Sequence, residues 1–293
     1  MTRLIFAAMV VFGQLPLPVL HAIGWGLGNL LWLIPSGQRR MTVRQIDLCL
    51  PGLPVGERRR IARKSLIESL KAICEISAFW FGADWRLRRW LDDPAALEKF
   101  RREVLAGGRG AIMLTPHQGA WELTSFFCGL SGPLTALYKP QDSAADPVIL
   151  RGRQRRPGVR LVPTDTAGVK AVLAALKRGE MAGILPDHDP PEGSGRFAPL
   201  FGMPAHTMDL VPKLASRGGV PVWYIVAERQ SWGRGFRFHL LPAPDGIADL
   251  ERGATALNAG LEDCIRRWPH QYWWSYKRFR RRPEGSPDPY SDL

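Results

Sequence analysis

The chain has 293 residues, enough for one large α/β domain with a small accessory element. Hydrophobic residues make up 45% and charged residues 23%, so the composition predicts a packed core and excludes a globally disordered chain. The net charge of +13 favours an anionic partner, but alone it does not choose among nucleic acid, anionic lipid and an acidic carrier protein.

Cysteine usage gives no sign of a disulfide framework or a zinc site. The four cysteines lie far apart, with no C-x-x-C pair and no companion histidines at ligand spacing, at positions Cys49, Cys74, Cys128 and Cys264. Disulfide scaffolds and structural zinc sites show closely spaced cysteines. We therefore expect a main domain that folds in a reducing, cytosolic environment.

The N-terminal stretch is strongly apolar. Residues 4–35 contain no Asp, Glu, Lys or Arg, and as one helix they would be long enough to cross a bilayer. Pro16 and Pro18 interrupt the run, so a kinked span and a re-entrant pair of short helices are both open. Arginines follow at once, at Arg39, Arg40 and Arg44, and by the positive-inside tendency this end faces the cytoplasm. We expect residues 1–36 to be a membrane-anchoring helical segment, with a cleaved signal peptide as the alternative.

The rest of the chain alternates between strand-like and helix-like runs. Residues 57–81 have helical apolar spacing and a basic face, which predicts an amphipathic helix. The predicted strands are 111–115, 134–138, 159–162, 181–185, 220–227 and 236–241, and the later predicted helices are 121–130, 169–177, 208–216 and 250–268. This alternation predicts an α/β fold with a largely parallel central sheet flanked by helices. We expect one domain over residues 37–283, a loop over residues 187–204 and a flexible tail over residues 284–293.

Polar residues follow several of these strands. His117, Lys139 and the pair Asp187 and Asp189 each come after a predicted strand. In parallel sheets, ligands bind beyond the carboxyl ends of the strands. The sequence therefore predicts a site at one edge of the sheet.

His117 and Glu122 are the candidate catalytic pair. Histidine can be a neutral base at cellular pH, and a carboxylate that accepts its second ring N–H would fix the tautomer and stabilise the imidazolium. A spacing of five residues across a strand-to-helix turn allows the two side chains to meet. The alternative is ordinary: His117 caps the helix, and Glu122 is solvated near its positive end.

Motifs of several other reaction classes are missing. The sequence has no G-x-S-x-G nucleophile elbow and neither common glycine-rich phosphate loop. No nucleic-acid-binding motif accompanies the positive charge, and the apolar N-terminus favours a bilayer instead. The tripeptide Asp187-His188-Asp189 can ligate a divalent metal, but a hydrogen-bonded turn is the more common role, so we expect no metal.

Four segments, in order along the chain, resemble one family. They read LTPHQGAWEL, YKPQDSAADPVILRGRQR, KRGEMAGILPDHDPPEGSGRFAPLFGMPAHTM and HQYWWSYKRFRRRP. Together they are similar to the late acyltransferases of lipid A biosynthesis, the lauroyl/myristoyl transferases, within the wider lysophospholipid and glycerol-3-phosphate acyltransferase group. The similarity runs from the apolar N-terminus to about residue 283.

This resemblance implies a glycerol-3-phosphate acyltransferase-like fold and an acyltransferase domain over residues 37–283. It implies transfer of a fatty acyl group from acyl carrier protein to a hydroxyl of a lipid A precursor, with no cofactor and no acyl-enzyme. It places the catalytic domain at the cytoplasmic face of the inner membrane, in contact with anionic lipid and not with nucleic acid. The alternatives are another glycolipid or lysophospholipid acceptor, or an inactive membrane-tethered lipid-binding protein.

Site residues also follow from the resemblance. His117 and Glu122 match the catalytic H-x4-[DE] motif. The resemblance matches Arg151, Arg153, Asp187, Asp189, Phe197, Pro199, Phe201 and Gly202 to substrate-binding segments. Lys139, which follows a predicted strand, and Thr207 are further candidate substrate-binding residues. His188 departs from the glutamine usual between the two aspartates, which bears on acceptor or chain-length preference. Aromatic residues before the catalytic strand, Trp80, Phe81, Trp85 and Trp90, either line an acyl groove or belong to the helix core.

Overall fold

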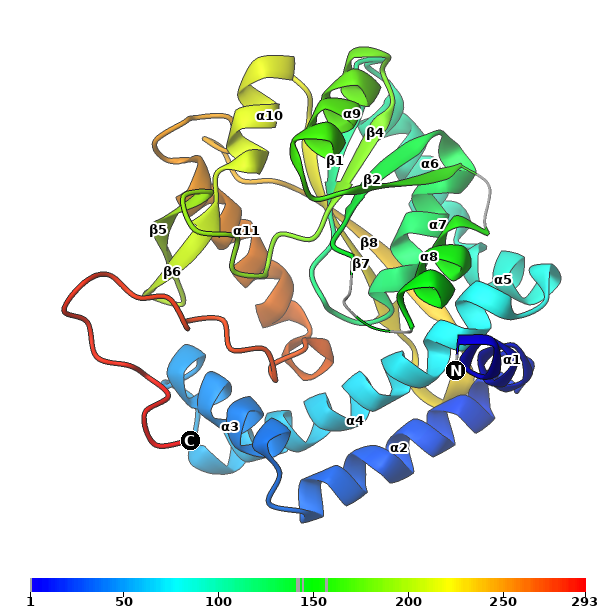
Figure 1. Cartoon of the computed structure of the whole chain (residues 1–293), viewed down its shortest axis with the longest axis vertical. Helices are drawn as coiled ribbons and strands as arrows, with labels where there is room; N and C mark the ends of the chain where they lie inside the picture. Colours follow the sequence, from blue (N-terminus) through cyan, green and yellow to red (C-terminus); the bar gives the residue numbers. More distant parts are fainter. Residues whose placement is uncertain (1, 141–142, 144, 156–157) are drawn as a thin grey trace.

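A six-stranded sheet forms the centre of the protein. The structure, a computed structural model, describes residues 2–140, 143, 145–155 and 158–293 (Figure 1). The sheet order is β3-β2-β4-β1-β7-β8. The strands are β1 (Ala111–Leu114), β2 (Leu134–Tyr138), β3 (Val159–Pro163), β4 (Met181–Ile184), β7 (Val222–Arg229) and β8 (Phe236–Pro242). Neighbours from β3 to β7 pair in parallel and β8 runs antiparallel to β7, so the predicted, largely parallel sheet is confirmed.

Both faces of the sheet are buried. Along β1, successive side chains point to opposite faces, as the two-residue period of a strand requires. Ala111 and Met113 belong to one hydrophobic core, and Ile112 and Leu114 belong to the other. A strand covered on both faces is apolar throughout, which is why AIML carries no polar residue.

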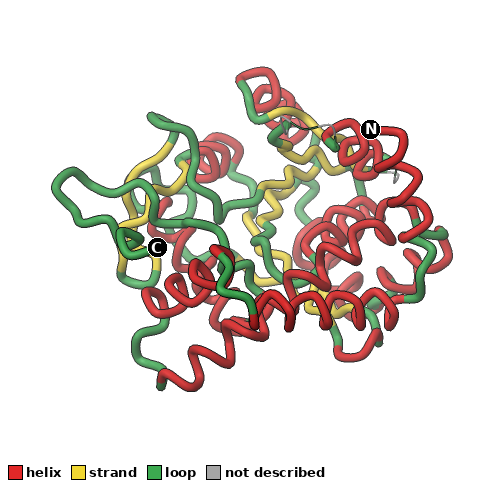
Figure 2. The backbone as a smooth tube through the Cα atoms, turned by 60° about the horizontal axis from the view of Figure 1, so that its bottom comes forward, coloured by secondary structure: helices red, strands yellow, loops and turns green. Residues whose placement is uncertain are grey.

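Helices form the layers on either side (Figures 1 and 2). Before the sheet come α1 (Thr2–Phe12), α2 (Leu17–Leu33), α3 (Gly37–Cys49), α4 (Val55–Phe81), α5 (Asp84–Leu91), α6 (Pro94–Lys99) and the π-helical turn η1 (Phe100–Leu105). Within and after it come α7 (Trp121–Ser131), α8 (Asp146–Gln154), α9 (Thr166–Lys177), α10 (Leu210–Gly218), η2 (Ser231–Gly233), α11 (Gly253–Arg267) and η3 (Pro269–Gln271). One core lies under α5, α6, α7 and the end of α4, and the other under α3, α9, α10 and α11.

The apolar N-terminus forms α1 and α2, which meet at an angle of 116°. The break falls at the two prolines that interrupt the run in the sequence. In the described part of the chain, no single helix has the length and apolarity of a bilayer span, whereas this bent pair meets that criterion jointly. Figure 1 shows α2 lying alongside α4.

The prediction of a loop over residues 187–204 is wrong. The segment contains β5 (Gly195–Leu200), which pairs with β6 (Met203–Met208) in an antiparallel hairpin. Its two-residue turn has φ of +51° at Phe201 and +75° at Gly202, a left-handed pair that matches the twist of a hairpin. The turn was missed because Phe-Gly lacks the usual asparagine or aspartate signal.

Residues 284–293, expected to be a flexible tail, contact α3. The Tyr290 ring is buried, and its hydroxyl donates to Gln45 Oε1 at 3.0 Å. Arg44 Nε also donates to the Pro289 carbonyl at 2.6 Å. The C-terminus accordingly lies beside α3 (Figure 1).

Candidate active site

Two neighbouring strands bring His117 and Asp187 together. β1 ends at Leu114, and the parallel strand beside it, β4, ends at Ile184, so the residues that follow both lie at one edge of the sheet. There, His117 Nδ1 lies 3.0 Å from Asp187 Oδ1, and the His117 amide donates to Asp187 Oδ2, also at 3.0 Å. The expected convergence of these two strand ends is confirmed.

Asp187 determines which nitrogen of His117 carries a proton. Burial of Asp187 opposes a negative charge, but the charge and hydrogen bonds of His117 outweigh it and hold the pKa of Asp187 well below its usual value. An ionised carboxylate only accepts hydrogen bonds, so His117 Nδ1 is the donor in this pair and Nε2 is the ring nitrogen left for a substrate. Nε2 is therefore the atom that can take a proton from a substrate.

Glu122 does not hold the His117 ring, contrary to the prediction. It lies in the first turn of α7, where Arg153 Nε donates to both of its carboxylate oxygens at 3.0 Å. Trp80 Nε1 donates to Glu122 Oε2 at 3.1 Å. Within the described residues, no hydrogen bond or ion pair joins Glu122 to His117, whose carboxylate partner is Asp187. The start of α7 directs Glu122 toward α4 and α8 and away from the imidazole.

The two arginines of the predicted RGR segment contact different parts of the protein. Burial disfavours the charge of Arg153, but Glu122 more than compensates and raises the pKa of Arg153 above its usual value. Its guanidinium also lies 5.3 Å from the centre of the Tyr138 ring. Arg151 instead places its guanidinium 4.4 Å from the centre of the Phe6 ring, on α1. The structure thus brings Arg153, and not Arg151, to Glu122.

His188 stacks on the candidate base. Its ring lies parallel to the His117 ring, with centres 4.1 Å apart and planes 5° apart, and Tyr276 stacks behind it at 4.0 Å. One side of His188 stays exposed. Burial, followed by the electrostatic effect of the neighbouring His117, lowers the pKa of His188 to about 4. At neutral pH, His188 is an uncharged aromatic surface beside His117.

Asp189 and Asp187 have different hydrogen-bond partners. It accepts a hydrogen bond from His206 at 2.7 Å and one from Arg280 at 2.6 Å. His206 belongs to β6 and Arg280 to the C-terminal segment, so Asp189 ties the hairpin to the end of the chain. Across the residues that the structure describes, no three His, Cys, Asp or Glu side chains are arranged to hold a metal ion.

A family model described as bacterial lipid A biosynthesis acyltransferase matches residues 1–281. The chain belongs to this family. Among its relatives is an Escherichia coli lipid A biosynthesis lauroyltransferase, 32% identical over 94% of this chain and 90% of the relative. An E. coli palmitoleoyltransferase is 28% identical over the same shares. An E. coli myristoyltransferase is 21% identical over 93% of this chain and 83% of the relative. The family resemblance expected from the four segments is confirmed, and the protein is an acyltransferase.

In this lipid A acyltransferase, the predicted loop residues lie on the β5–β6 hairpin. Phe197 is 42% exposed on β5, and the Arg266 guanidinium lies 4.8 Å from the centre of the Phe201 ring. Thr207 is fully buried, and its hydroxyl accepts from Asn258 at 2.8 Å. Pro199 faces Pro204 across the hairpin. The direct contacts of Thr207 are therefore structural, and its predicted substrate contact stays a proposal, as do those of the hairpin residues, Gly202 and Lys139.

Several residues of the acyltransferase site were missed from the sequence. Arg229, on β7, donates from Nη2 to the Gly119 carbonyl at 3.2 Å. The Gln271 carbonyl accepts from the Gly119 amide at 2.9 Å, and Trp273 donates its amide to the His117 carbonyl at 3.0 Å. Gly119 has φ of +59°, and a Cβ there would collide with the neighbouring β7 backbone. These contacts hold the turn that carries His117. The only signal in the sequence was the HQYWWSYK segment of the family resemblance, which contains Gln271 and Trp273.

Proposed function

We propose that the protein transfers a fatty acyl group from acyl carrier protein to a hydroxyl of a lipid A precursor. Its family and the names of its relatives support lipid A as the product. The observation that carries the chemistry is the His117–Asp187 pair at the edge of the sheet. This pair is a histidine base oriented by a carboxylate, and it would activate an alcohol.

The reaction is an addition to the thioester carbonyl followed by elimination of the thiolate, without an acyl-enzyme. His117 Nε2 removes the proton from the acceptor hydroxyl while that oxygen forms a bond to the thioester carbonyl carbon. The tetrahedral oxyanion then collapses, the carbon–sulfur bond breaks, and the imidazolium returns its proton to the carrier thiolate. Asp187 stabilises the imidazolium between these two steps through its hydrogen bond to Nδ1.

Buried thiols support transfer without an acyl-enzyme. Burial raises the pKa of Cys74 to about 11 and that of Cys128 to about 12, so both stay protonated at neutral pH. A protonated, buried thiol is a poor nucleophile. Neither thiol is therefore suited to form a thioester with the acyl group, which agrees with the proposed direct transfer to the acceptor.

Glu122 acts through Arg153 in this proposal. The Arg153 side chain is 27% exposed, while Glu122 fixes its Nε and Nη2 atoms from the buried side. The remaining guanidinium donors would bind an anionic group, a phosphate of the acceptor or the developing oxyanion. Glu122 is then a positioning residue for an arginine, and Arg153 is the contact to the substrate.

The site would work beside a bilayer. We propose that residues 1–36 attach the protein to the cytoplasmic face of the inner membrane, and that residues 37–283 form the acyltransferase domain. The apolar α1–α2 pair and the arginines that follow it support this location.

Acyl transfer by the purified protein tests the proposal. Labelled acyl carrier protein and a lipid A precursor are the substrates, and mass spectrometry identifies the acylated product. We expect His117→Ala to lower the rate by about 10²–10⁴-fold. The matched control is His239→Ala, because His239 also pairs with a carboxylate, Glu228, at 2.9 Å, but lies on β8. Wild-type turnover by His117→Ala would exclude it as the base. Turnover only with a lysophospholipid would change the acceptor and leave the chemistry intact.

A further inference from the structure

Helix α2 has one buried face and one exposed apolar face. Its buried residues, Leu17, Leu20, His21, Gly24 and Gly28, follow helical spacing and pack toward the protein. Val19, Leu30 and Leu33 lie on the opposite side, and Trp25 and Leu27 lie on its two flanks. We name these five residues, which are 42–74% exposed, the docking face. Contiguous exposed apolar side chains on a helix mark a surface that contacts a partner or a membrane.

Close packing holds the docking face outward. A Cβ at Gly24 or Gly28 would collide with the α4 backbone at Lys71 or Ile67, so the two helices approach as closely as glycine allows. Such a contact tolerates no rotation of α2 about its axis, because any other side would bring a larger side chain to α4.

A buried ion cluster adds to this attachment. His21 Nε2 lies 2.5 Å from Glu75 Oε1, and Arg229 Nε lies 2.5 Å from the same oxygen. The Gly233 amide donates to His21 Nδ1 at 3.2 Å, so the His21 proton is on Nε2 and points at Glu75. Arg229 also binds Gly119, which joins α2 to the turn after His117.

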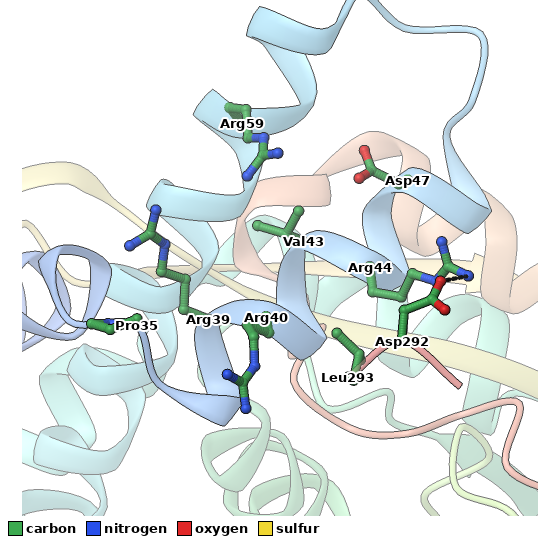
Figure 3. Close-up of a pocket in the computed structure, with 9 residues that line it drawn as sticks. All are labelled: Pro35, Arg39, Arg40, Val43, Arg44, Asp47, Arg59, Asp292 and Leu293. Carbon is green, nitrogen blue, oxygen red and sulfur yellow. Dashed lines mark ion pairs between the residues drawn. The ribbon is translucent and has the colours of Figure 1, made fainter. Parts of the chain in front are cut away.

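An arginine groove begins at Pro35, directly after α2, and is formed by α3, the start of α4 and the C-terminus (Figure 3). It is a hollow of about 360 Å³ whose charged lining is four arginines, Arg39, Arg40, Arg44 and Arg59, and two aspartates, Asp47 and Asp292. Arg44 pairs with Asp292, at 3.7 Å. Arg39, Arg40 and Arg59 have no carboxylate partner among residues 2–140, 143, 145–155 and 158–293.

A second hollow lies on α2 and borders the first through Arg39. Its volume is about 320 Å³, and its lining is Trp25, Asn29, Trp32, Leu33 and Arg63. The Arg39 guanidinium lies 4.8 Å from the centre of the Trp32 ring, so one arginine borders both hollows. Apolar side chains and tryptophans of α2 are thus followed by guanidinium groups of α3 and α4, three of which have no carboxylate partner in the described residues.

We propose that α2 lies along the surface of an anionic bilayer, with the docking face at the acyl–headgroup boundary and the arginine groove bound to lipid phosphate. Helices that lie in this interface combine an apolar face, tryptophan at the boundary and arginine at the headgroups. Guanidinium groups bind phosphate through paired hydrogen bonds. The adjoining apolar face favours lipid over an acidic carrier protein, whose charged surface would leave these side chains in water. The inference rests on the proposed membrane location, and it is independent of the acyl transfer.

Vesicle flotation of the whole protein without substrates tests this surface. The vesicles are phosphatidylcholine alone or mixed with phosphatidylglycerol, at low and high salt. We expect the wild type to float with the anionic vesicles, less so at high salt. The triple variant Arg39→Gln, Arg40→Gln, Arg59→Gln should bind them at least tenfold more weakly, since each arginine near an anionic surface contributes about fivefold. The double variant Leu30→Gln, Leu33→Gln should bind both kinds of vesicle more weakly.

The matched control removes the same charge elsewhere. Arg101→Gln, Arg217→Gln, Arg237→Gln changes three exposed arginines on other elements and should bind within about twofold of the wild type, as should His117→Ala. Circular dichroism confirms that each variant is folded. Equal losses in both arginine triples would overturn the groove and leave only net charge. Unchanged flotation with lost binding to acyl carrier protein would assign the groove to the carrier. A wild type that floats with neither vesicle would remove the membrane location itself, whatever the transferase assay shows.

Discussion

Asp187 and Glu122 are both carboxylates of the candidate site, and they have separable roles. Asp187 bonds the His117 ring, whereas Glu122 bonds Arg153. A base needs its orienting carboxylate at every turnover, because the imidazolium forms in each cycle. The two residues should therefore fail in different ways when changed.

Asp187→Asn should lower kcat by about 10²–10³-fold, because an amide at this position no longer stabilises an imidazolium. Glu122→Gln should mainly raise KM for a phosphorylated acceptor, since it loosens Arg153, the proposed substrate contact. Steady-state kinetics with the acceptor varied separates the two. A wild-type kcat for Asp187→Asn, with the fold intact by circular dichroism, would contradict the assignment.

His188 should not titrate in the working pH range. A pKa lowered to about 4 means that His188 is neutral above about pH 5. Phenylalanine keeps the stacked ring and cannot take a proton, so His188→Phe should retain kcat/KM within about threefold and the same pH profile from pH 5 to 8. A step near pH 6.5 that is present in the wild type and absent in the variant would show that His188 protonates there.

Helix α2 is held to α4 and β7 by charge as well as by packing. Glu75 is fully buried and accepts hydrogen bonds from Arg229 and His21. Burial opposes its ionisation, but the Arg229 charge wins and lowers the pKa of Glu75. Removing one member of a buried ion pair leaves the other uncompensated, and this is costly.

Glu75→Gln should therefore lower the free energy of unfolding by about 3 kcal/mol. Glu68→Gln, which changes a more exposed partner of the same arginine, should cost about 1 kcal/mol. Urea unfolding followed by circular dichroism measures both. Equal effects of the two substitutions would mean that the cluster is solvated rather than dry.

The fold of the whole molecule combines three features in one unit: the His117–Asp187 pair at the edge of the sheet, Arg153 on α8 and the exposed apolar surface of α2. Three guanidinium groups without a carboxylate partner in the described residues, those of Arg39, Arg40 and Arg59, line the arginine groove next to α2. Part of the net charge of +13 is therefore concentrated at this groove.

Stability should fall with acid in two stages. Burial and neighbouring cations lower the pKa of His188 and that of His270, so the unfolded chain binds protons that the folded chain does not as pH falls below about 6.5. Ion pairing lowers the pKa of Glu75, Asp187 and Asp189 despite burial, which adds a second loss below about pH 4.5. Calorimetric Tm should be flat from pH 7 to 8, fall gently below 6.5 and steeply below 4.5. A Tm unchanged down to pH 4 would contradict both assignments.

The sequence by itself determined the strands of the central sheet and the position of the candidate base. Buried parallel strands are mostly apolar, so they can be recognised in the sequence as apolar runs that end at polar residues. The run before His117, for example, ends at Thr115 and Pro116. The family was equally readable, since its segments are contiguous in the chain.

Only the tertiary structure decided which carboxylate serves His117. Asp187 is 70 residues away from His117 in the chain and reaches it because β4 lies beside β1, a neighbour relation set by helical crossovers and by packing on both faces of the sheet. Glu122 is near in sequence, but a helix fixes side-chain direction, and α7 points it at Arg153. Spacing along a chain limits which residues can meet, and the packing of distant elements selects among them.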